Sequence, residues 1–229
     1  MRRVMTLWDA TVGRKIVMAG TGVVLILFVI GHMVGNLKVY MGAEAFNHYA
    51  EGLRTFGAPF FGPMQLLWLI RGFLLACVAL HIWAAISLTL HSRRARPVGY
   101  RKYEGNELVF SYASRTMLWG GVILAAFVVY HLLHFTLGSA HPDFIPGDAY
   151  HNFVVGFQSW PVAIVYIAAM IALGLHLYHG IWSMLQTMGA NNAKYNHLRR
   201  PIALIVTLLV VLANISFPVA VLTGLVTLG

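Results

Sequence analysis

Charged side chains are scarce in this 229-residue chain, and acidic ones are the scarcest. Lysine, arginine, aspartate and glutamate together make up 10% of the residues, whereas a soluble domain carries about a quarter. Hydrophobic residues make up 59% of the chain, and its mean hydropathy is +0.73. These values exclude an ordinary soluble domain and predict an integral membrane protein.

Cysteine is nearly absent as well, because Cys77 is the only one in the sequence. A single thiol cannot form an internal disulfide, a four-cysteine iron–sulfur site or the C-x-x-C-H anchor of a covalent haem. We therefore expect Cys77 to be a small buried packing residue. A haem in this chain would therefore have to be bound without a covalent link.

Long apolar runs are abundant in the sequence. A hydrocarbon core of roughly 30 Å is crossed by about 20 apolar residues in a helix. Five runs are long enough, which predicts an all-α membrane protein, a single domain with five transmembrane helices. They cover residues 14–37, 64–91, 115–137, 160–188 and 201–228. A further surface helix is predicted at residues 43–53, in the first loop.

Basic residues are distributed unevenly between the two sides of these predicted helices. Thirteen of the 16 lysines and arginines precede or open the first helix, or lie between the second and third or the fourth and fifth. By the positive-inside rule this places the N-terminus in the cytoplasm. The first run lacks an A-x-A cleavage signal, so we expect a retained helix. The net charge of +9 thus reflects topology, and we expect no nucleic-acid partner.

Histidines inside the apolar runs are the residues that lipid would accommodate least. Ionisable side chains at such depth are candidates for a functional site. Depth along each helix, at about 1.5 Å per residue, sorts four histidines into two pairs, each pair at one depth on different helices. The pairs are His32 with His131 and His81 with His176.

Two imidazoles at one depth on facing helices suit the two axial positions of a haem iron, an arrangement that favours electron transfer over oxygen chemistry. The four histidines therefore predict two stacked haems of the b type, with the first four helices forming the haem-binding bundle. His134 and His179 lie three residues after His131 and His176, and helical spacing alone leaves either member of each pair as the ligand. A membrane transporter that uses these histidines as proton or metal relays is the alternative from another class.

Haem propionates buried in a membrane need cationic or hydrogen-bonding partners, because unpaired charges are costly in a low dielectric. Basic residues that flank or enter the predicted helices are the candidates. They are Arg14, Lys15, Arg71 and Arg115.

The ordered set of motifs resembles the cytochrome b membrane anchor of succinate dehydrogenases and quinol:fumarate reductases, of the single-chain, five-helix, two-haem type. The resemblance covers nearly the whole chain. It is carried by GRKIVMAGTG at residues 13–22, HMVGNL at 32–37, His81, Arg115, Tyr130–His131 and HLYHGIWS at 176–183.

The resemblance implies that the haem ligands are the first histidine of each ambiguous pair, together with the two others. These are His32, His81, His131 and His176. It also implies a bacterial cytoplasmic (inner) membrane location and two partners, a flavoprotein subunit that oxidises succinate and an iron–sulfur subunit that relays the electrons. The chain would pass them through two b haems to menaquinone or another quinone, carrying no catalytic residues for the dicarboxylate itself.

A quinol:fumarate reductase, running in the reverse direction, would use the same residues. Some members of the family have an acidic residue two positions before the last haem ligand, where it moves protons. Gly174 occupies that position here, so the resemblance does not extend to a transmembrane proton path of that kind.

Overall fold

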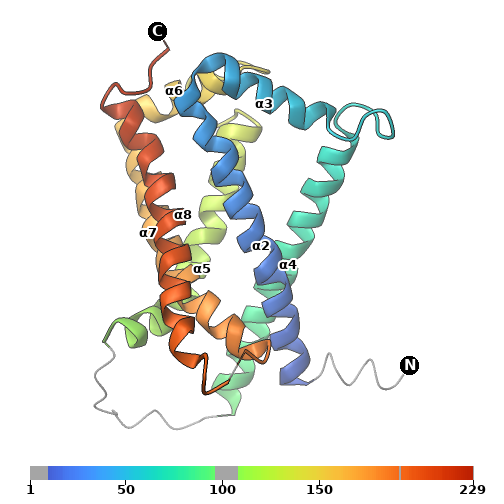
Figure 1. Ribbon diagram of the computed structural model, residues 1–229, viewed down its shortest axis with the longest axis vertical. Helices are drawn as coiled ribbons and strands as arrows, with labels where there is room; N and C mark the ends of the chain where they lie inside the picture. The colour runs from blue at the N-terminus through green and yellow to red at the C-terminus, as the bar shows by residue number, and fades with distance from the viewer. Residues whose placement is uncertain (1–9, 96–107, 191, 229) are drawn as a thin grey trace.

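The computed structural model describes residues 10–95, 108–190 and 192–228, and of residues 108–115 it describes the backbone alone. Within these ranges the chain is all-helical and has no strand. Five of the helices are long and apolar enough to cross a membrane, which confirms that prediction. They are α2 (Thr11–Asn36), α4 (Gln65–Arg94), α5 (Leu108–His131), α7 (Trp160–Thr187) and α8 (Arg199–Leu222) (Figure 1).

The membrane helices contact one another in the order α4, α2, α7 and α5, and α8 packs along α7. Close approach of α7 and α8 depends on a small residue, because a Cβ built on Gly174 would lie 3.0 Å from Val211 Cγ2. Cys77 is buried within α4, as predicted. The cytoplasmic position of the N-terminus stays a prediction.

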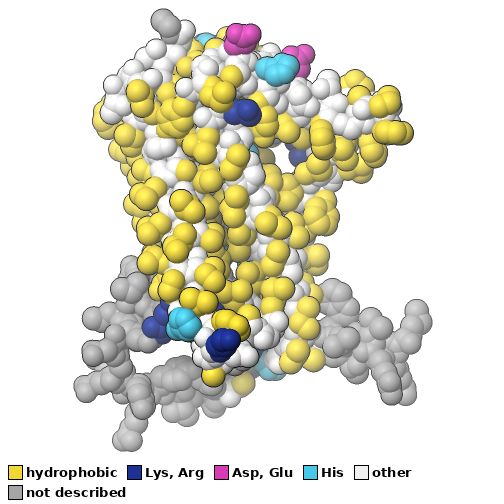
Figure 2. All heavy atoms as spheres, in the orientation of Figure 1, with side chains coloured by type: hydrophobic (Ala, Val, Ile, Leu, Met, Phe, Trp, Pro, Cys, Tyr) yellow, Lys and Arg dark blue, Asp and Glu magenta, His cyan; other side chains and the backbone are white. Residues whose placement is uncertain are grey.

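Hydrophobic side chains cover the lateral surface of the helices, and charged ones gather toward the two ends (Figure 2). Large apolar residues such as Leu27, Trp119 and Leu209 are more than half exposed. Soluble proteins rarely expose contiguous apolar surfaces of this extent. The exposed surface is therefore that of a multi-pass membrane protein.

Two shorter helices, α3 (Ala43–Thr55) and α6 (Ala149–Gln158), lie across one end of the membrane helices (Figure 1). We call this the α3/α6 end. The surface helix predicted at residues 43–53 is confirmed by α3. By contrast, α6 was not predicted, since residues 138–159 read as a loop that contains two prolines and two aspartates.

The N-terminus of α6 is fixed by Asp148, whose Oδ1 accepts hydrogen bonds from the His151 N–H and from Asn47 Nδ2, both at 2.9 Å. The Asn47 side chain also accepts from the Tyr150 N–H at 2.9 Å, and so links α3 to α6. The His151 N–H, followed by the other hydrogen bonds, holds the pKa of the Asp148 carboxyl below its ordinary value. A charged cap at a helix N-terminus is stabilising.

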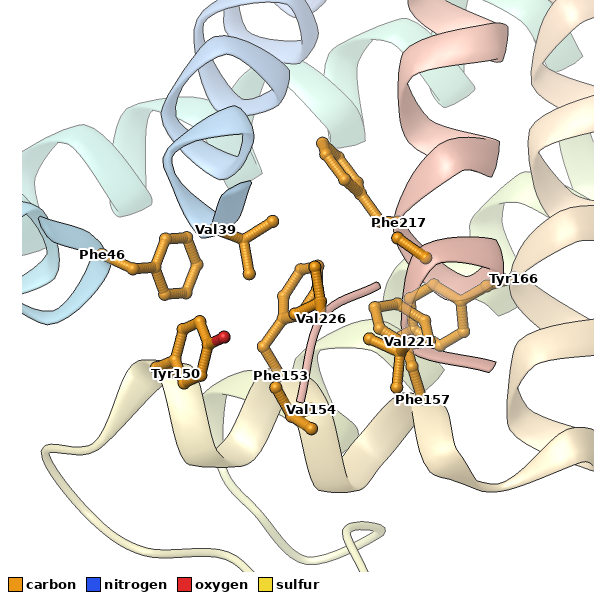
Figure 3. Close-up of a cluster of buried hydrophobic side chains, with 11 residues drawn as sticks. Val39, Phe46, Tyr150, Phe153, Val154, Phe157, Tyr166, Phe217, Val221 and Val226 are labelled. Carbon is orange, nitrogen blue, oxygen red and sulfur yellow. The ribbon is translucent and has the colours of Figure 1, made fainter. Parts of the chain in front are cut away.

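An aromatic cluster fills the space between α6 and the ends of the membrane helices (Figure 3). Phe153 contacts Phe46 of α3 and Phe217 of α8, with ring centroids 5.6 and 5.7 Å apart. Phe157 packs edge-on against Tyr166 of α7 at 4.9 Å. This cluster of buried side chains joins α6 to α3, α7 and α8.

Two helix boundaries differ from the predicted ones by more than three residues. The last helix was predicted to reach residue 228, but α8 ends at Leu222, because the chain turns at Gly224 (φ +75°) and the Leu225 N–H returns to the carbonyl of Ala220 at 2.9 Å. The helix predicted from residue 115 begins seven residues earlier. Its last turn widens into a π-helix, Leu132–Thr136.

Candidate functional site

The first pair of histidines lies near the α3/α6 end. The rings of His32 on α2 and His131 on α5 face each other, with centroids 5.8 Å apart and planes at 87°. Phe28, one turn earlier on α2, stacks on His32 at 5.4 Å. The His32 side chain is exposed although it lies deep within an apolar helix.

The second pair lies nearer the middle of the helices. The centroids of His81 on α4 and His176 on α7 are 6.2 Å apart, with planes at 60°. The His81 ring lies against Gly22 of α2, where a Cβ would be 3.6 Å from Cε1. His32 follows Gly22 by ten residues on the same helix, which separates the two pairs by about 15 Å along α2.

The spacing of both pairs fits one metal ion between two imidazoles. A bond from a metal to a ring nitrogen is about 2 Å long, so two rings on opposite sides of one ion have centroids about 6 Å apart. In the described residues, no three His, Cys, Asp or Glu side chains converge as a metal site built from protein alone would require. Two facing imidazoles suit haem, whose porphyrin supplies the remaining iron ligands.

The orientation of His81 is fixed by Thr21, which directly precedes Gly22 on α2. The Thr21 hydroxyl donates its only proton to the Val17 carbonyl at 2.7 Å, so it must accept at its 3.1 Å contact with His81 Nδ1. The proton of His81 is therefore on Nδ1, which leaves the lone pair of Nε2 for a metal. Such outer hydrogen bonds commonly orient metal-binding histidines.

The orientation of His131 is set by Tyr166 on α7. The Tyr166 hydroxyl lies 3.2 Å from His131 Nδ1 and 3.1 Å from Nδ1 of His134. His131 is thus engaged through Nδ1, and Nε2 is again the ring nitrogen left for a metal. Each pair therefore has one histidine whose Nδ1 is hydrogen-bonded to a hydroxyl on a neighbouring helix.

The two alternative histidines do not take part in the facing pairs. His134 is fully buried, and its ring stacks on Tyr130 at 5.5 Å and on His141 at 4.9 Å. The His179 ring lies beside Trp182, one turn along its own helix, at 6.0 Å. The geometry thus brings together the four predicted ligands in the predicted pairs, while ligation of iron stays a prediction.

An apolar cavity of about 170 Å³ adjoins His176 between α5 and α7. Gly120 and Ile123 of α5 and Leu175 of α7 are among the residues that line it. The volume is below the roughly 300–1,000 Å³ of a typical site for a drug-sized ligand. The cavity is therefore smaller than a complete site for a large ligand.

The predicted propionate partners lie at both ends of the membrane helices. Arg14 is half-buried and Lys15 is exposed at the start of α2, and the side chain of Arg115 lies outside the described part of the chain. Arg71 is at the α3/α6 end, where its guanidinium covers the Trp68 ring at 5.0 Å.

Arg54 lies close enough to Arg71 to repel it electrostatically, although the sequence did not single out Arg54. In the described residues neither arginine forms an ion pair with a carboxylate. Two neighbouring cations without a protein counter-ion would attract an anionic group.

Comparison of the chain with protein-family models, with curated proteins and with solved structures finds no match. The resemblance drawn from the motifs is thus untested by these comparisons. The sequence analysis also missed Thr21 and Tyr166. Thr21 could have been found from the sequence, because it is a polar residue in an apolar helix and lies within the GRKIVMAGTG stretch. No sequence feature points to Tyr166, because tyrosines are common in such helices.

Proposed function

We propose that this chain is a di-haem cytochrome b embedded in the membrane. In this proposal His32 and His131 are the axial ligands of one haem, and His81 and His176 those of the other. The observation that carries it is the spacing of the two ring pairs, 5.8 and 6.2 Å between centroids, on four different helices that are able to cross a membrane.

Within this class, the motifs favour a particular protein, the membrane-anchor subunit of a succinate:quinone oxidoreductase. The chain would receive electrons from an iron–sulfur subunit, itself supplied by a flavoprotein subunit, and would deliver them to menaquinone or another quinone. Support comes from the order of HMVGNL, Tyr130–His131 and HLYHGIWS along the sequence. A quinol:fumarate reductase would use the same path in reverse.

Bound haem would supply one-electron transfer, since histidine at both axial positions leaves no site for oxygen. The chain's own residues hold and orient the cofactors. Thr21 would fix the tautomer of His81, and Tyr166 would engage Nδ1 of His131. The separation of about 15 Å along α2 places the two sites in sequence along the membrane helices.

The basic residues would bind the propionates, which otherwise would be unpaired charges in a low dielectric. Arg71, with Arg54 beside it, lies at the same end as the His32–His131 pair. Arg14, Lys15 and Arg115 lie toward the opposite end, nearer the His81–His176 pair. Each haem would thus have its cationic partners at the closer end of the membrane helices.

Ligand substitutions test the proposal. We expect His176→Ala to bind one haem per chain and His179→Ala to bind two, measured as haem released from purified protein, because the His176 ring faces that of His81. His81→Ala and the double variant His81→Ala/His176→Ala should lose the same spectral component as His176→Ala and nothing more.

A wild-type protein without a Soret band would contradict the proposal and favour the transporter. Retention of both haems in His176→Ala would contradict the ligand assignment. The His179→Ala variant is the matched control, since it removes an imidazole one turn away on the same helix.

A further inference from the structure

Tyr166 has no role in the sequence argument, yet its hydroxyl lies between two histidines of α5 and the turn that follows. It is 3.2 Å from Nδ1 of His131 and 3.1 Å from Nδ1 of His134. The tyrosine side chain is buried, and three phenylalanine rings pack against it. They are Phe127 at 4.9 Å, Phe157 at 4.9 Å and Phe135 at 5.6 Å.

The direction of these two hydrogen bonds follows from counting protons. A tyrosine hydroxyl carries one proton, so it can donate to only one of the two ring nitrogens and must accept from the other. If His131 offers Nε2 to iron, its own proton is on Nδ1, and His131 is the donor. The Tyr166 proton then goes to Nδ1 of His134.

The surroundings of His134 fix the position of its ring. With Nδ1 as an acceptor, neutral His134 carries its proton on Nε2, and that buried atom has no hydrogen-bond partner in the described residues. Buried polar atoms without partners are rare, so the ring orientation is imposed by its contacts. Gly156 of α6 lies against it, since a Cβ there would be 2.9 Å from His134 Cε1.

His134 also contacts a second histidine, whose tautomer follows from its own hydrogen bonds. His141 stacks on His134 at 4.9 Å, donates from Nε2 to the Asn152 carbonyl at 2.7 Å and accepts at Nδ1 from the Asp143 N–H at 3.1 Å. Its donor and acceptor are both used, so His141 cannot turn to serve His134. His134 is thereby kept with Nδ1 directed at Tyr166.

We propose that Tyr166 is a positioning residue for His131: its hydroxyl, held by His134, accepts the Nδ1 proton of the ligand and lowers the midpoint potential of the haem at the α3/α6 end. The inference rests on the proposed function, because it concerns a ligand of that haem. A hydrogen bond accepted from a ligating imidazole makes the ligand more electron-rich, and this stabilises oxidised over reduced iron.

The test is a redox titration of the purified protein followed in the visible spectrum. In Tyr166→Phe, one of the two midpoints should rise, with a change on the order of tenfold in the equilibrium between the two redox states, which is about 59 mV for one electron. The other midpoint should stay at its wild-type value. Tyr150→Phe is the matched control, because the Tyr150 hydroxyl donates to the Thr227 carbonyl at the same end and contacts no histidine.

A variant that keeps the shape of the site guards against misfolding. Incorporation of 3-fluorotyrosine at position 166 weakens the hydroxyl as an acceptor and should raise the same midpoint by a smaller amount. Equal midpoints in wild type and in the fluorinated protein would overturn the role of Tyr166, as would an equal shift of both haems. Absence of haem from the wild type would instead overturn the proposed function.

Discussion

Replacement of Thr21 by valine removes one oxygen next to the His81–His176 pair and leaves the shape of the side chain almost unchanged. The Thr21 hydroxyl donates to the Val17 carbonyl and accepts from His81 Nδ1. Without it, the Nδ1 proton of His81 loses this acceptor, although the ring also interacts with the Met18 backbone. Loss of a good hydrogen-bond partner from a buried donor costs up to about 1–3 kcal/mol.

That free energy corresponds to a loss of roughly 5- to 150-fold in the affinity of this pair for its haem. Loss of an outer hydrogen bond typically weakens a metal site by about 10- to 100-fold, which agrees with this range. We expect Thr21→Val to release one of its two haems faster than the wild type, with the other unaffected. The assay is transfer of haem to an excess of apomyoglobin, followed in the Soret region.

Thr89→Val is the matched control, since the Thr89 hydroxyl donates to the Ala85 carbonyl at 2.8 Å within α4. It loses the same kind of bond within a helix without affecting a candidate ligand. Wild-type haem retention in Thr21→Val, or equal losses in the two variants, would refute the reasoning.

Three other predictions concern packing, charge and potential. Gly156→Ala should destabilise the fold by about 1–3 kcal/mol, because its Cβ would lie 2.9 Å from the His134 ring and 3.1 Å from two others. Gly52→Ala has open space around its Cβ, and should be neutral or stabilising in thermal unfolding. Because the pKa of Asp148 is lowered in the folded protein, its charged carboxyl contributes fully to the free energy of unfolding at neutral pH. The difference in that free energy between wild type and Asp148→Asn should vanish as the pH falls below about 4. A difference that stays constant with pH would contradict this. Arg71→Gln should lower one midpoint potential by tens of millivolts, because removal of a nearby positive charge favours oxidised iron, while Arg93→Gln at the opposite end should leave that midpoint unchanged.

The five membrane helices could be predicted because length and apolar composition alone determine whether a helix can cross a bilayer. Depth along the helices could also be estimated, since the rise per residue converts sequence position into depth, and His32 lies beside His131 and His81 beside His176. His131 and His134 could not be distinguished in this way, because both lie on one face of a helix. Their difference comes from the π-helical turn after His131 and from the contact of Gly156 with His134.

The α6 helix and the end of α8 could not be predicted from apolar patterning. Prolines and aspartates before α6 are typical of a loop, and only the contacts of Asp148 with α3 show that one of these aspartates caps a helix. The apolar run after Leu222 continues in composition, although Gly224 ends the helix by its left-handed conformation. Tyr166 was missed because its role depends on the packing of α7 against α5.

The central claim is that four histidines hold two haems between four membrane helices. The most direct measurement is a redox-titrated visible spectrum of the purified protein, combined with the amount of haem per chain. We expect a spectrum of b-type haem, two haems per chain and two reductive transitions. A colourless protein, or one haem with a single transition, would contradict the claim.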